Sequence, residues 1–331
     1  MAVTKPQGVG VLIEETGDTN IVELAGRERW LCADRLFDPL QSWSMGEEVR
    51  PDLSSGDSLQ GPSALCRMPP MAGMSQCEWH ALCDQVVDAM SKHVGRWVTP
   101  VSSSVPPDRA ELVGTGSYLD FSGRTYLLTN EHVAQQGEEP GHQFEGCADV
   151  YRVRLPFALH RPPLDVALAL VPAEVCSNAV FCGGIPSERL ATRHDPQPGE
   201  MLFFIGYGAS KAKFLFGQLN TPGSPYATQQ AELEDDDRLD PELHFSLPYM
   251  PDRAMRADGR SGGLPSPPGL SGSLVWNTRF VECLNAGRQW SPDLAQVTGL
   301  VWGWASESGH VFATKVEHLG IQSLVDELCS S

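Results

Sequence analysis

The sequence is poor in basic residues, with 24 Lys and Arg against 42 Asp and Glu and a formal net charge of −18. Such a chain repels the phosphates of nucleic acids and of anionic membranes, so we expect neither as a partner. It contains no run of about eighteen apolar residues, so no membrane-spanning helix is expected. The apolar run over residues 9–13 is too short for a secretory signal. We therefore expect a cytoplasmic protein.

Metal-binding and redox motifs are also missing. The nine cysteines are scattered, without a C-x-x-C pair or zinc-finger spacing, which predicts reduced thiols. The nine histidines form no H-E-x-x-H or H-x-H motif. The pair Gly206 and Gly208 is typical of a strand-end turn, not of a phosphate-binding loop. We expect no metal and no other cofactor.

Glycine and proline are abundant, at 32 and 26 of 331 residues. This composition and a series of about ten short apolar segments separated by turns predict a mainly β protein of paired barrels or a sandwich. We expect a small SH3-like β unit over 1–40, a linker and amphipathic helix over 41–95, and a β domain over 96–331. Ser75 and Glu78 form a possible capping box for that helix. The acidic run inside the insertion over 220–265 lacks calcium-loop spacing and is typical of a solvated loop.

Three short segments carry residues suited to nucleophilic catalysis. An apolar strand over 126–129 leads into a turn that presents His132. Asp165 opens a nearly continuous apolar strand. Ser271 lies in a tight bend before another strand, with Gly269 two residues before it and Gly272 directly after it. A serine hydroxyl needs a base to become nucleophilic, and a histidine held by a buried carboxylate can serve as that base.

The three segments together resemble the motifs of trypsin/chymotrypsin-like serine proteases, especially the bacterial branch. Thr129-Asn-Glu-His132-Val133 resembles the histidine motif, Asp165-Val-Ala the aspartate motif, and Gly269-Leu-Ser271-Gly-Ser-Leu the serine motif. The resemblance covers about 96–331. It implies a two-barrel chymotrypsin-like fold with a C-terminal helix, and a serine endopeptidase that acts on a protein or peptide. The catalytic residues would be His132, Asp165 and Ser271, with the backbone N–H groups of Gly269 and Ser271 as the oxyanion hole.

Departures from the family pattern concern activation and specificity. Leu270 occupies the position where trypsins carry an aspartate that pairs with a new N-terminal ammonium, so no activation of that type is expected. Pro265 and Trp304 stand at substrate-pocket positions and indicate a narrow or apolar pocket. Asp252 and Asp258 remain open as charges that could reach it. Without zymogen control, we expect residues 1–75 to bind a regulatory protein or to recruit the substrate.

Three other functions compete with this interpretation. A catalytically silent protease fold could serve as a binding module. An α/β-hydrolase is disfavoured because Ser273 stands where its nucleophile motif needs glycine. A cysteine hydrolase would use Cys147, Cys176 or Cys182 with His142 or His160, but no family signature surrounds them, and buried structural thiols are expected instead.

Overall fold

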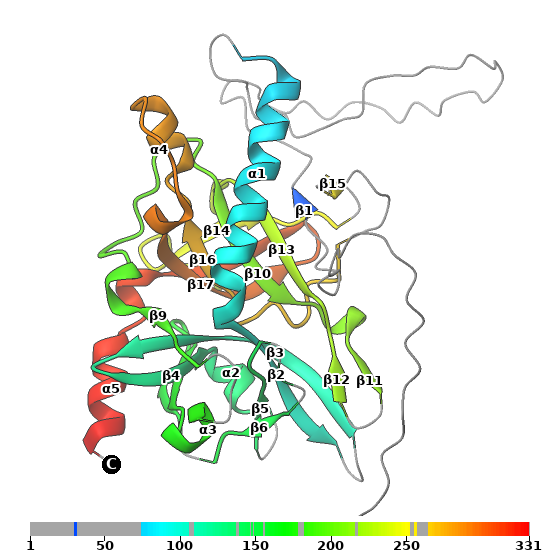
Figure 1. Cartoon of the computed structure of the whole chain (residues 1–331), viewed down its shortest axis with the longest axis vertical. Coiled ribbons are helices and arrows are strands. Elements are labelled where there is room, and N and C mark those ends of the chain that lie inside the picture. The colour runs from blue at the N-terminus through cyan, green and yellow to red at the C-terminus, as the bar shows by residue number, and fades with distance from the viewer. Residues whose placement is uncertain are drawn as a thin grey trace, which may run out of the picture.

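The computed structural model describes residues 30–31, 74–105, 109–136, 139–145, 147, 149–154, 156–177, 182–215, 218–251, 255–256 and 264–330. Most of this chain lies in two curled β-sheets, one above the other (Figure 1). We call them the first sheet, built from residues 98–186, and the second sheet, built mainly from residues 202–315. The predicted fold class, mainly β with two half-barrels and a C-terminal helix, is confirmed.

The first sheet has the strand order β6-β5-β2-β3-β4-β8-β7, and β9 pairs with β3. Its strands are β2 (Val98–Val105), β3 (Arg109–Phe121), β4 (Arg124–Thr129), β5 (Gly141–His142), β6 (Tyr151–Arg152), β7 (Ala158–His160), β8 (Val166–Leu170) and β9 (Ile185–Pro186). A turn at Ser122 and Gly123 joins β3 to β4, and both residues have positive φ, as a two-residue hairpin turn of type I′ requires. This hairpin brings the strand that precedes His132 into the middle of the sheet.

The second sheet has the order β14-β18-β17-β16-β10-β13-β1-β15. Its strands are β1 (Trp30–Leu31), β10 (Leu202–Tyr207), β13 (Gly223–Thr228), β14 (His244–Pro248), β15 (Met255–Arg256), β16 (Leu274–Asn277), β17 (Gln296–Ala305) and β18 (His310–Lys315). A separate hairpin consists of β11 (Lys213–Leu215) and β12 (Gln218–Asn220). Strand β13 lies within the predicted insertion, which is therefore partly a sheet strand.

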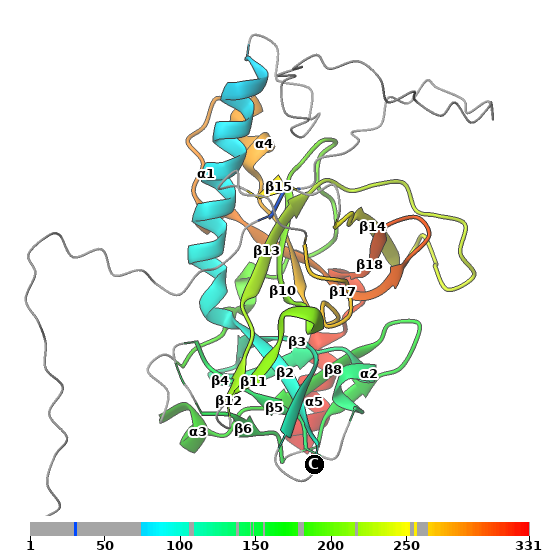
Figure 2. The ribbon, with the colours of Figure 1, turned by 90° about the vertical axis from the view of Figure 1, so that its right-hand side faces the viewer.

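The helices join the sheets into one body. They are α1 (Gln76–Val94), α2 (Glu131–Ala134), α3 (Ala173–Ser177), α4 (Phe280–Asn285) and α5 (Ile321–Ser330), with 3-10 turns at Gly95–Trp97, Ser187–Arg189, Ala209–Lys211, Pro292–Leu294 and Val316–His318. Helix α1 runs along the second sheet, and α5 packs on β7 and β8 of the first (Figures 1 and 2). Because α5 follows β18 in the chain, it ties the two sheets together.

The predicted helix begins at its predicted capping box. The Ser75 N–H donates to Glu78 Oε2 over 2.8 Å, and the Glu78 N–H donates to Ser75 Oγ over 3.3 Å. Its apolar stripe is buried in a core cluster that also holds residues of both sheets and of α5. Trp79, for example, contacts Phe280 of α4 with the ring centroids 6.0 Å apart. The helix is thus part of the shared core.

The predicted N-terminal unit lies mostly outside the described residues. Of residues 1–40, only Trp30–Leu31 are described, and they pair in parallel with β13 and antiparallel with β15. The SH3-like unit, the linker over 41–73 and the domain boundaries stay predictions. No helix within the described ranges is long and apolar enough to cross a membrane.

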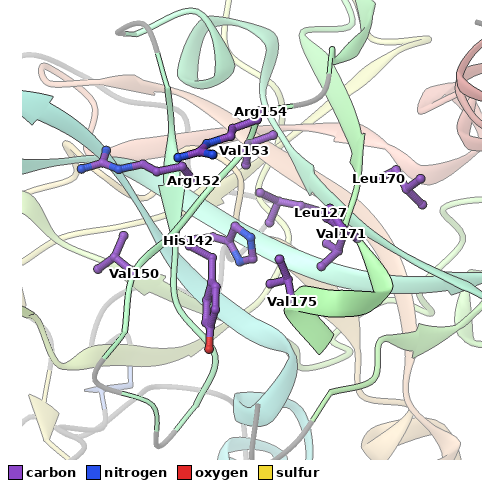
Figure 3. A pocket seen from close by; sticks show the side chains of 11 residues that line it. Leu127, His142, Val150, Arg152, Val153, Arg154, Leu170, Val171 and Val175 are labelled. Carbon is purple, nitrogen blue, oxygen red and sulfur yellow. The ribbon is translucent and has the colours of Figure 1, made fainter. Parts of the chain in front are cut away.

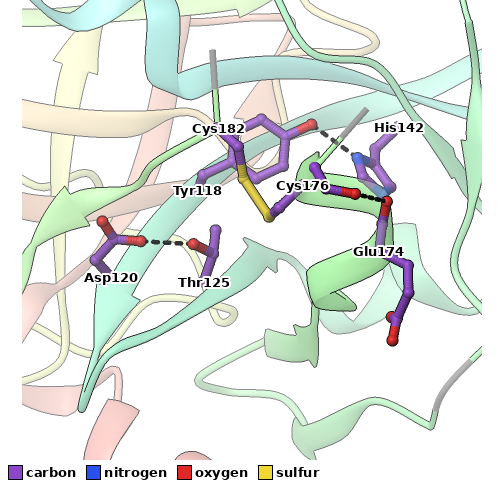
Figure 4. The surroundings of a disulfide bond; sticks show 8 residues. Tyr118, Asp120, Thr125, His142, Glu174, Cys176 and Cys182 are labelled. Atoms are coloured by element: carbon purple, nitrogen blue, oxygen red, sulfur yellow. Dashed lines mark hydrogen bonds between the residues drawn. A yellow bond between two sulfur atoms is a disulfide. The ribbon is translucent and has the colours of Figure 1, made fainter. Parts of the chain in front are cut away.

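One sequence-based prediction about cysteine is wrong. Cys176 at the end of α3 and Cys182 form a disulfide, with their Cα atoms 5.1 Å apart (Figure 4). That separation lies within the ordinary range for a disulfide, and six residues of sequence are enough to bring the pair together. The pair therefore holds no thiol for a cysteine hydrolase. Cys147, like Cys176 and Cys182, packs against the buried apolar cluster of Tyr118, Leu127, Phe144 and Val171. The thiol argument for a cytoplasmic location no longer applies, and that location stays a prediction.

Candidate active site

His132 and Asp165 form the centre of the candidate site. His132 lies on α2, directly after β4, and Asp165 directly precedes β8, the neighbour of β4 in the sheet. His132 Nδ1 lies 2.6 Å from Asp165 Oδ2, and the His132 backbone N–H donates to Oδ1 over 3.0 Å. An ionised carboxylate only accepts, so Nδ1 must carry the proton. This leaves Nε2 as the atom that can take a proton from a nucleophile.

The Asp165 carboxylate is buried and the His132 imidazole is partly exposed, which is the arrangement that general-base catalysis needs. The Asp165 side chain is 6% exposed, whereas the His132 side chain is 40% exposed. A buried carboxylate interacts more strongly with an imidazolium than an exposed one does, because less water screens it. The arrangement can therefore stabilise a protonated His132 while the ring stays accessible from solvent.

Ser271 reaches the same place from the second sheet. Its carbonyl accepts the Thr115 N–H over 2.7 Å, and the Thr115 carbonyl accepts the Thr129 hydroxyl over 2.7 Å. Thr129 ends the strand that leads to His132. A Cβ built on Gly114 would lie 2.6 Å from Val133, the residue after His132, and 3.1 Å from the Ser271 carbonyl. The loop that contains Ser271 is thus packed directly on the segments that flank His132.

Gly272, which directly follows Ser271, makes this close packing possible. Gly272 has a φ of 91°, and a side chain there would overlap the Thr115 carbonyl and approach the Thr129 hydroxyl to 2.6 Å. Both the backbone conformation and the space exclude other residues. The glycine-flanked serine of the sequence therefore has a physical cause, since the bend presses against the first sheet.

The Ser271 hydroxyl donates to the Trp302 carbonyl of β17 over 3.4 Å. Within the part of the chain that the structure describes, it makes no hydrogen bond to His132. A rotation about the Cα–Cβ bond is the smallest motion that redirects this hydroxyl. Catalytic hydrogen bonds are often long or poorly aligned when no substrate is bound.

The backbone N–H groups around Ser271 differ in whether they are hydrogen-bonded. The N–H groups of Leu270, Gly272 and Ser273 donate to backbone carbonyls over 2.9, 2.8 and 3.0 Å. Those of Gly269 and Ser271 donate to no acceptor among the described residues. These two are the N–H groups that the sequence predicts for an oxyanion hole, and they are available for one.

The orientation of these two N–H groups is fixed from the opposite side of their peptide bonds. The Pro268 carbonyl accepts the Ala209 N–H over 2.8 Å. The Leu270 carbonyl accepts the Ser273 N–H over 3.0 Å and the Ser273 hydroxyl over 2.6 Å. In a planar trans peptide the N–H points away from the C=O, so holding each carbonyl directs the N–H of Gly269 or Ser271. Donors held in this way need no reorganisation when charge develops on a substrate oxygen.

The predicted specificity residues lie on two different segments. Pro265 is buried beside Gly208, and its carbonyl accepts the Tyr249 hydroxyl over 2.9 Å. Trp304 lies two residues beyond Trp302 on β17 and is 38% exposed, as a large apolar side chain rarely is. Leu270 is 2% exposed within an apolar cluster, so no carboxylate stands at that position to pair with an ammonium. Asp252 and Asp258 lie outside the described residues.

Sequence reasoning missed the polar residues that connect these parts. Thr115 is fully buried; its hydroxyl donates to the Gly269 carbonyl over 2.7 Å and accepts the Tyr207 N–H over 2.9 Å. Asn130 is fully buried and donates to the Asp165 carbonyl over 2.7 Å. Asn130 stands within the histidine motif and could have been singled out. Thr115 carries no signal, because its partners lie far away in the sequence.

A separate pocket of about 380 Å³ lies in the first sheet and includes none of the three predicted catalytic residues (Figure 3). Its lining comprises Leu127, His142, Val150, Tyr151, Arg152, Val153, Arg154, Leu170, Val171, Pro172 and Val175. The imidazole of His142 lies among the apolar side chains (Figure 3). Burial raises the pKa of Tyr118, whose phenol therefore keeps its proton, and its hydroxyl is hydrogen-bonded to His142 Nδ1 over 2.7 Å.

We expect the protein to lose stability as the pH falls from about 6.5 to about 4. Burial lowers the pKa of His142 to about 4, whereas an unfolded histidine titrates near ~6.5. Below that pH the unfolded chain binds a proton that the native chain does not, so the free energy of unfolding drops by about 3 kcal/mol before levelling. Urea unfolding at several pH values measures this. His142→Asn, which keeps an acceptor for Tyr118 but cannot titrate, should show a shallower fall; an unchanged slope would contradict the assignment.

No protein-family model matches the sequence, and no curated protein matches it. Among solved structures, the chain is similar to the active form of the Rv3671c protease from M. tuberculosis, with 16% identity and a TM-score of 0.42 over 74% of this chain and 86% of that one. It is also similar to a serine endoprotease from Yersinia pestis, with 15% identity and a TM-score of 0.43 over 74% and 67%. An inactive form of Rv3671c shows 14% identity and a TM-score of 0.40 over 75% and 93%.

The arrangement of the described sheets and helices defines the fold. Two curled antiparallel sheets meet where β10 contacts β2 and β3, a C-terminal helix crosses between them, and the histidine, aspartate and serine segments converge at the junction. This is the fold of the trypsin-like serine proteases.

Proposed function

We propose that this protein is a serine endopeptidase that hydrolyses peptide bonds of a protein substrate. The observation that carries the proposal is the double hydrogen bond from His132 to the buried Asp165 carboxylate, beside the loop that presents Ser271. The pair of unbonded N–H groups at Gly269 and Ser271 supports it independently. Each of these features serves acyl transfer, and none is required for a β-sheet protein to fold.

The reaction proceeds in two steps. The Ser271 oxygen attacks the substrate carbonyl carbon while His132 Nε2 takes the hydroxyl proton, and the oxyanion accepts hydrogen bonds from the N–H groups of Gly269 and Ser271. His132 then gives the proton to the leaving amine, and the C–N bond breaks to leave an acyl ester on Ser271. A water molecule, deprotonated by His132, hydrolyses that ester and restores the serine. Asp165 stabilises the imidazolium in both steps.

Substrate choice and control extend the proposal. Pro265 and Trp304 favour small or uncharged side chains at the cleaved position. Since Leu270 leaves a buried ammonium without a partner, control by N-terminal cleavage is not expected, and residues 1–75 would recruit substrate or bind a regulatory protein inside the cell. The expected specificity rests on the positions of Pro265 and Trp304 in the sequence, and the expected absence of zymogen control rests on that of Leu270.

A second candidate function has one observation in its favour. The Ser271 hydroxyl donates to the Trp302 carbonyl over 3.4 Å and not to His132. If this geometry persisted with substrate bound, His132 could not take the hydroxyl proton, and the protein would be a silent binding module on a protease fold. The two functions differ in the chemical reactivity of one oxygen atom.

Labelling with a fluorophosphonate separates them. In the folded protein we expect an adduct on Ser271, because His132 takes the hydroxyl proton while the oxygen–phosphorus bond forms and fluoride leaves. Mass spectrometry of the digested full-length protein locates the adduct. Ser273, two residues away with a buried hydroxyl, is the internal control and should stay unmodified, as should Ser271 in urea. Absence of an adduct on Ser271 of the folded protein would favour the binding module.

A further inference from the structure

The backbone at Asp165 is held in a conformation that costs free energy. Asp165 has a φ of 53°, in the left-handed region that residues other than glycine seldom adopt. Such a residue persists only where its surroundings determine the backbone. The neighbouring groups should therefore include contacts that hold this segment. Besides the backbone N–H groups of Leu164 and Asp165, which donate to the Arg161 carbonyl, three side chains donate to its carbonyls.

The carbonyls of three consecutive residues each accept a side-chain hydrogen bond. The Pro163 carbonyl accepts from His244 Nε2 over 3.0 Å, and the Leu164 carbonyl accepts from the Thr314 hydroxyl over 3.0 Å. The Asp165 carbonyl accepts from Asn130 over 2.7 Å. Side chains seldom hold three successive carbonyls, since most backbone groups bond to other backbone groups.

Two of these donors come from the second sheet, although Asp165 belongs to the first. His244 on β14 and Thr314 on β18 are direct partners in the antiparallel register. Directly opposite residues project their side chains to the same face, about 5 Å apart. They therefore present two donors side by side, with a spacing suited to the carbonyls of adjacent residues.

The tautomer of His244 is fixed by its other nitrogen. His244 Nδ1 accepts the Asp240 N–H over 3.0 Å, so the ring proton is on Nε2 and points to the Pro163 carbonyl. His244 is 2% exposed and Thr314 is fully buried. The ring of His244 also contacts the ring of Trp302, the residue whose carbonyl holds the Ser271 hydroxyl, with centroids 5.2 Å apart.

We propose that His244 and Thr314 are positioning residues for the catalytic aspartate. By holding the carbonyls of Pro163 and Leu164, they keep the Asp165 carboxylate against the backbone N–H and Nδ1 of His132, and they make its position depend on the second sheet. This inference rests on the proposed function for its effect on catalysis. It also makes the end of the acidic run, just before β14, part of the catalytic support, since Asp240 orients His244.

Thr314→Val tests the proposal because it keeps the shape of the side chain and removes only the donor. We expect kcat for peptide hydrolysis to fall about 5–10-fold with KM unchanged, as expected when one hydrogen bond is lost from a group that acts through another. Thr314→Ser, which retains a hydroxyl, should restore kcat. His244→Phe should lower kcat at least as much, and His244→Gln, which places an amide N–H near the position of Nε2, should recover part of it.

Two control variants match these changes in burial and chemistry. Thr278→Val removes a fully buried hydroxyl that donates to the Met201 carbonyl over 2.8 Å. His194→Phe removes a buried imidazole that is bonded to Thr298 and Gln230 over 2.8 and 2.9 Å. Among the described residues, neither side chain is hydrogen-bonded to the segment 163–165. Both controls should lower the melting temperature without lowering kcat.

A second measurement does not depend on turnover. The proton between His132 Nδ1 and Asp165 should give a far-downfield NMR signal because that hydrogen bond is short and charge-assisted. We expect Thr314→Val and His244→Phe to shift or broaden it, and the two controls to leave it unchanged. The proposal is overturned if the signal and kcat of both variants match those of the wild type, or if kcat falls equally in the controls. Should the wild type resist fluorophosphonate labelling, the proposed function fails, and the NMR signal still decides whether the two side chains position Asp165.

Discussion

Replacing Ser271 by alanine is expected to lower kcat for peptide hydrolysis by a factor on the order of 10⁶. The change removes the only atom that forms a bond with the substrate, so acyl transfer through the protein ends. Among the described residues, the hydroxyl makes a single weak hydrogen bond, to the Trp302 carbonyl over 3.4 Å. The free energy of unfolding should therefore stay close to that of the wild type. A pool of fluorogenic peptides, assayed at high protein concentration, measures the rate without knowledge of the natural substrate.

The remaining rate should be insensitive to a second change in the same unit. His132→Ala combined with Ser271→Ala should be no slower than Ser271→Ala alone, because the base has no proton to take once the nucleophile is gone. Ser91→Ala is the matched control: it removes a buried hydroxyl on α1 that donates to the Val87 carbonyl over 2.6 Å. That variant should keep full activity. A Ser271→Ala protein that retains more than a few per cent of wild-type kcat would show that another group attacks the substrate.

Residual activity above the uncatalysed reaction is nevertheless expected from the oxyanion hole. Its two donors are backbone N–H groups, which no side-chain change removes, and their carbonyl partners on the opposite edges of the peptides stay bonded to Ala209 and Ser273. Binding and orientation of the scissile carbonyl would persist in the variant. The structure thus separates two contributions, one that depends on the nucleophile and one that belongs to the loop geometry.

The three segments that we propose to be catalytic could be singled out from the sequence because each is a local pattern. An apolar strand that ends at a polar residue can be recognised without knowing the fold, and so can a glycine-flanked serine. The same holds for the α1 capping box, where Ser75 and Glu78 bond to each other three residues apart. Local patterns of this kind identified the strand that leads to His132 and the strands that follow Asp165 and Ser271.

Contacts between distant parts of the chain could not be predicted in that way. Thr314 bonds to the Leu164 carbonyl across 150 residues, and Thr115 bonds to the Gly269 carbonyl across 154. A buried threonine on a strand looks the same in sequence whether it bonds within its sheet or across two sheets. Strand β13 was missed for another reason: Gly223, Ser224 and Pro225 are typical of a turn, yet they pair with β10 in the second sheet. Tertiary packing there outweighs local preference.

The link between the two sheets bears on how such a site can be controlled. Asp165 lies in the first sheet, Ser271 enters from the second, and the segment before Asp165 is held by side chains of the second. A shift of one sheet relative to the other would therefore move the nucleophile and release the carboxylate together. A partner that binds across the junction could change activity without touching His132, and this is a physical route by which residues 1–75 could act.

Asp165→Asn is expected to lower kcat/KM by about 10⁴ while leaving the fold intact. The two carboxylate oxygens accept from two donors of the same residue, the His132 N–H and Nδ1–H. An amide has one acceptor oxygen and one NH₂ group, so it cannot serve both donors. The backbone N–H cannot lose its proton, and it therefore takes the amide oxygen. The NH₂ group then faces Nδ1, which must give up its proton to Nε2.

In that tautomer His132 cannot act as the base for Ser271, because its only lone pair points at the introduced amide and not at the nucleophile. The defect should appear in kcat/KM and in the rate of fluorophosphonate labelling alike, and the downfield Nδ1–H signal should vanish. Asp120→Asn is the matched control, since Asp120 bonds to the Thr125 hydroxyl over 2.7 Å within the first sheet and lies outside the site. If Asp165→Asn retained wild-type labelling, Asp165 would not set the tautomer, and the buried carboxylate would serve only to hold α2 against β8.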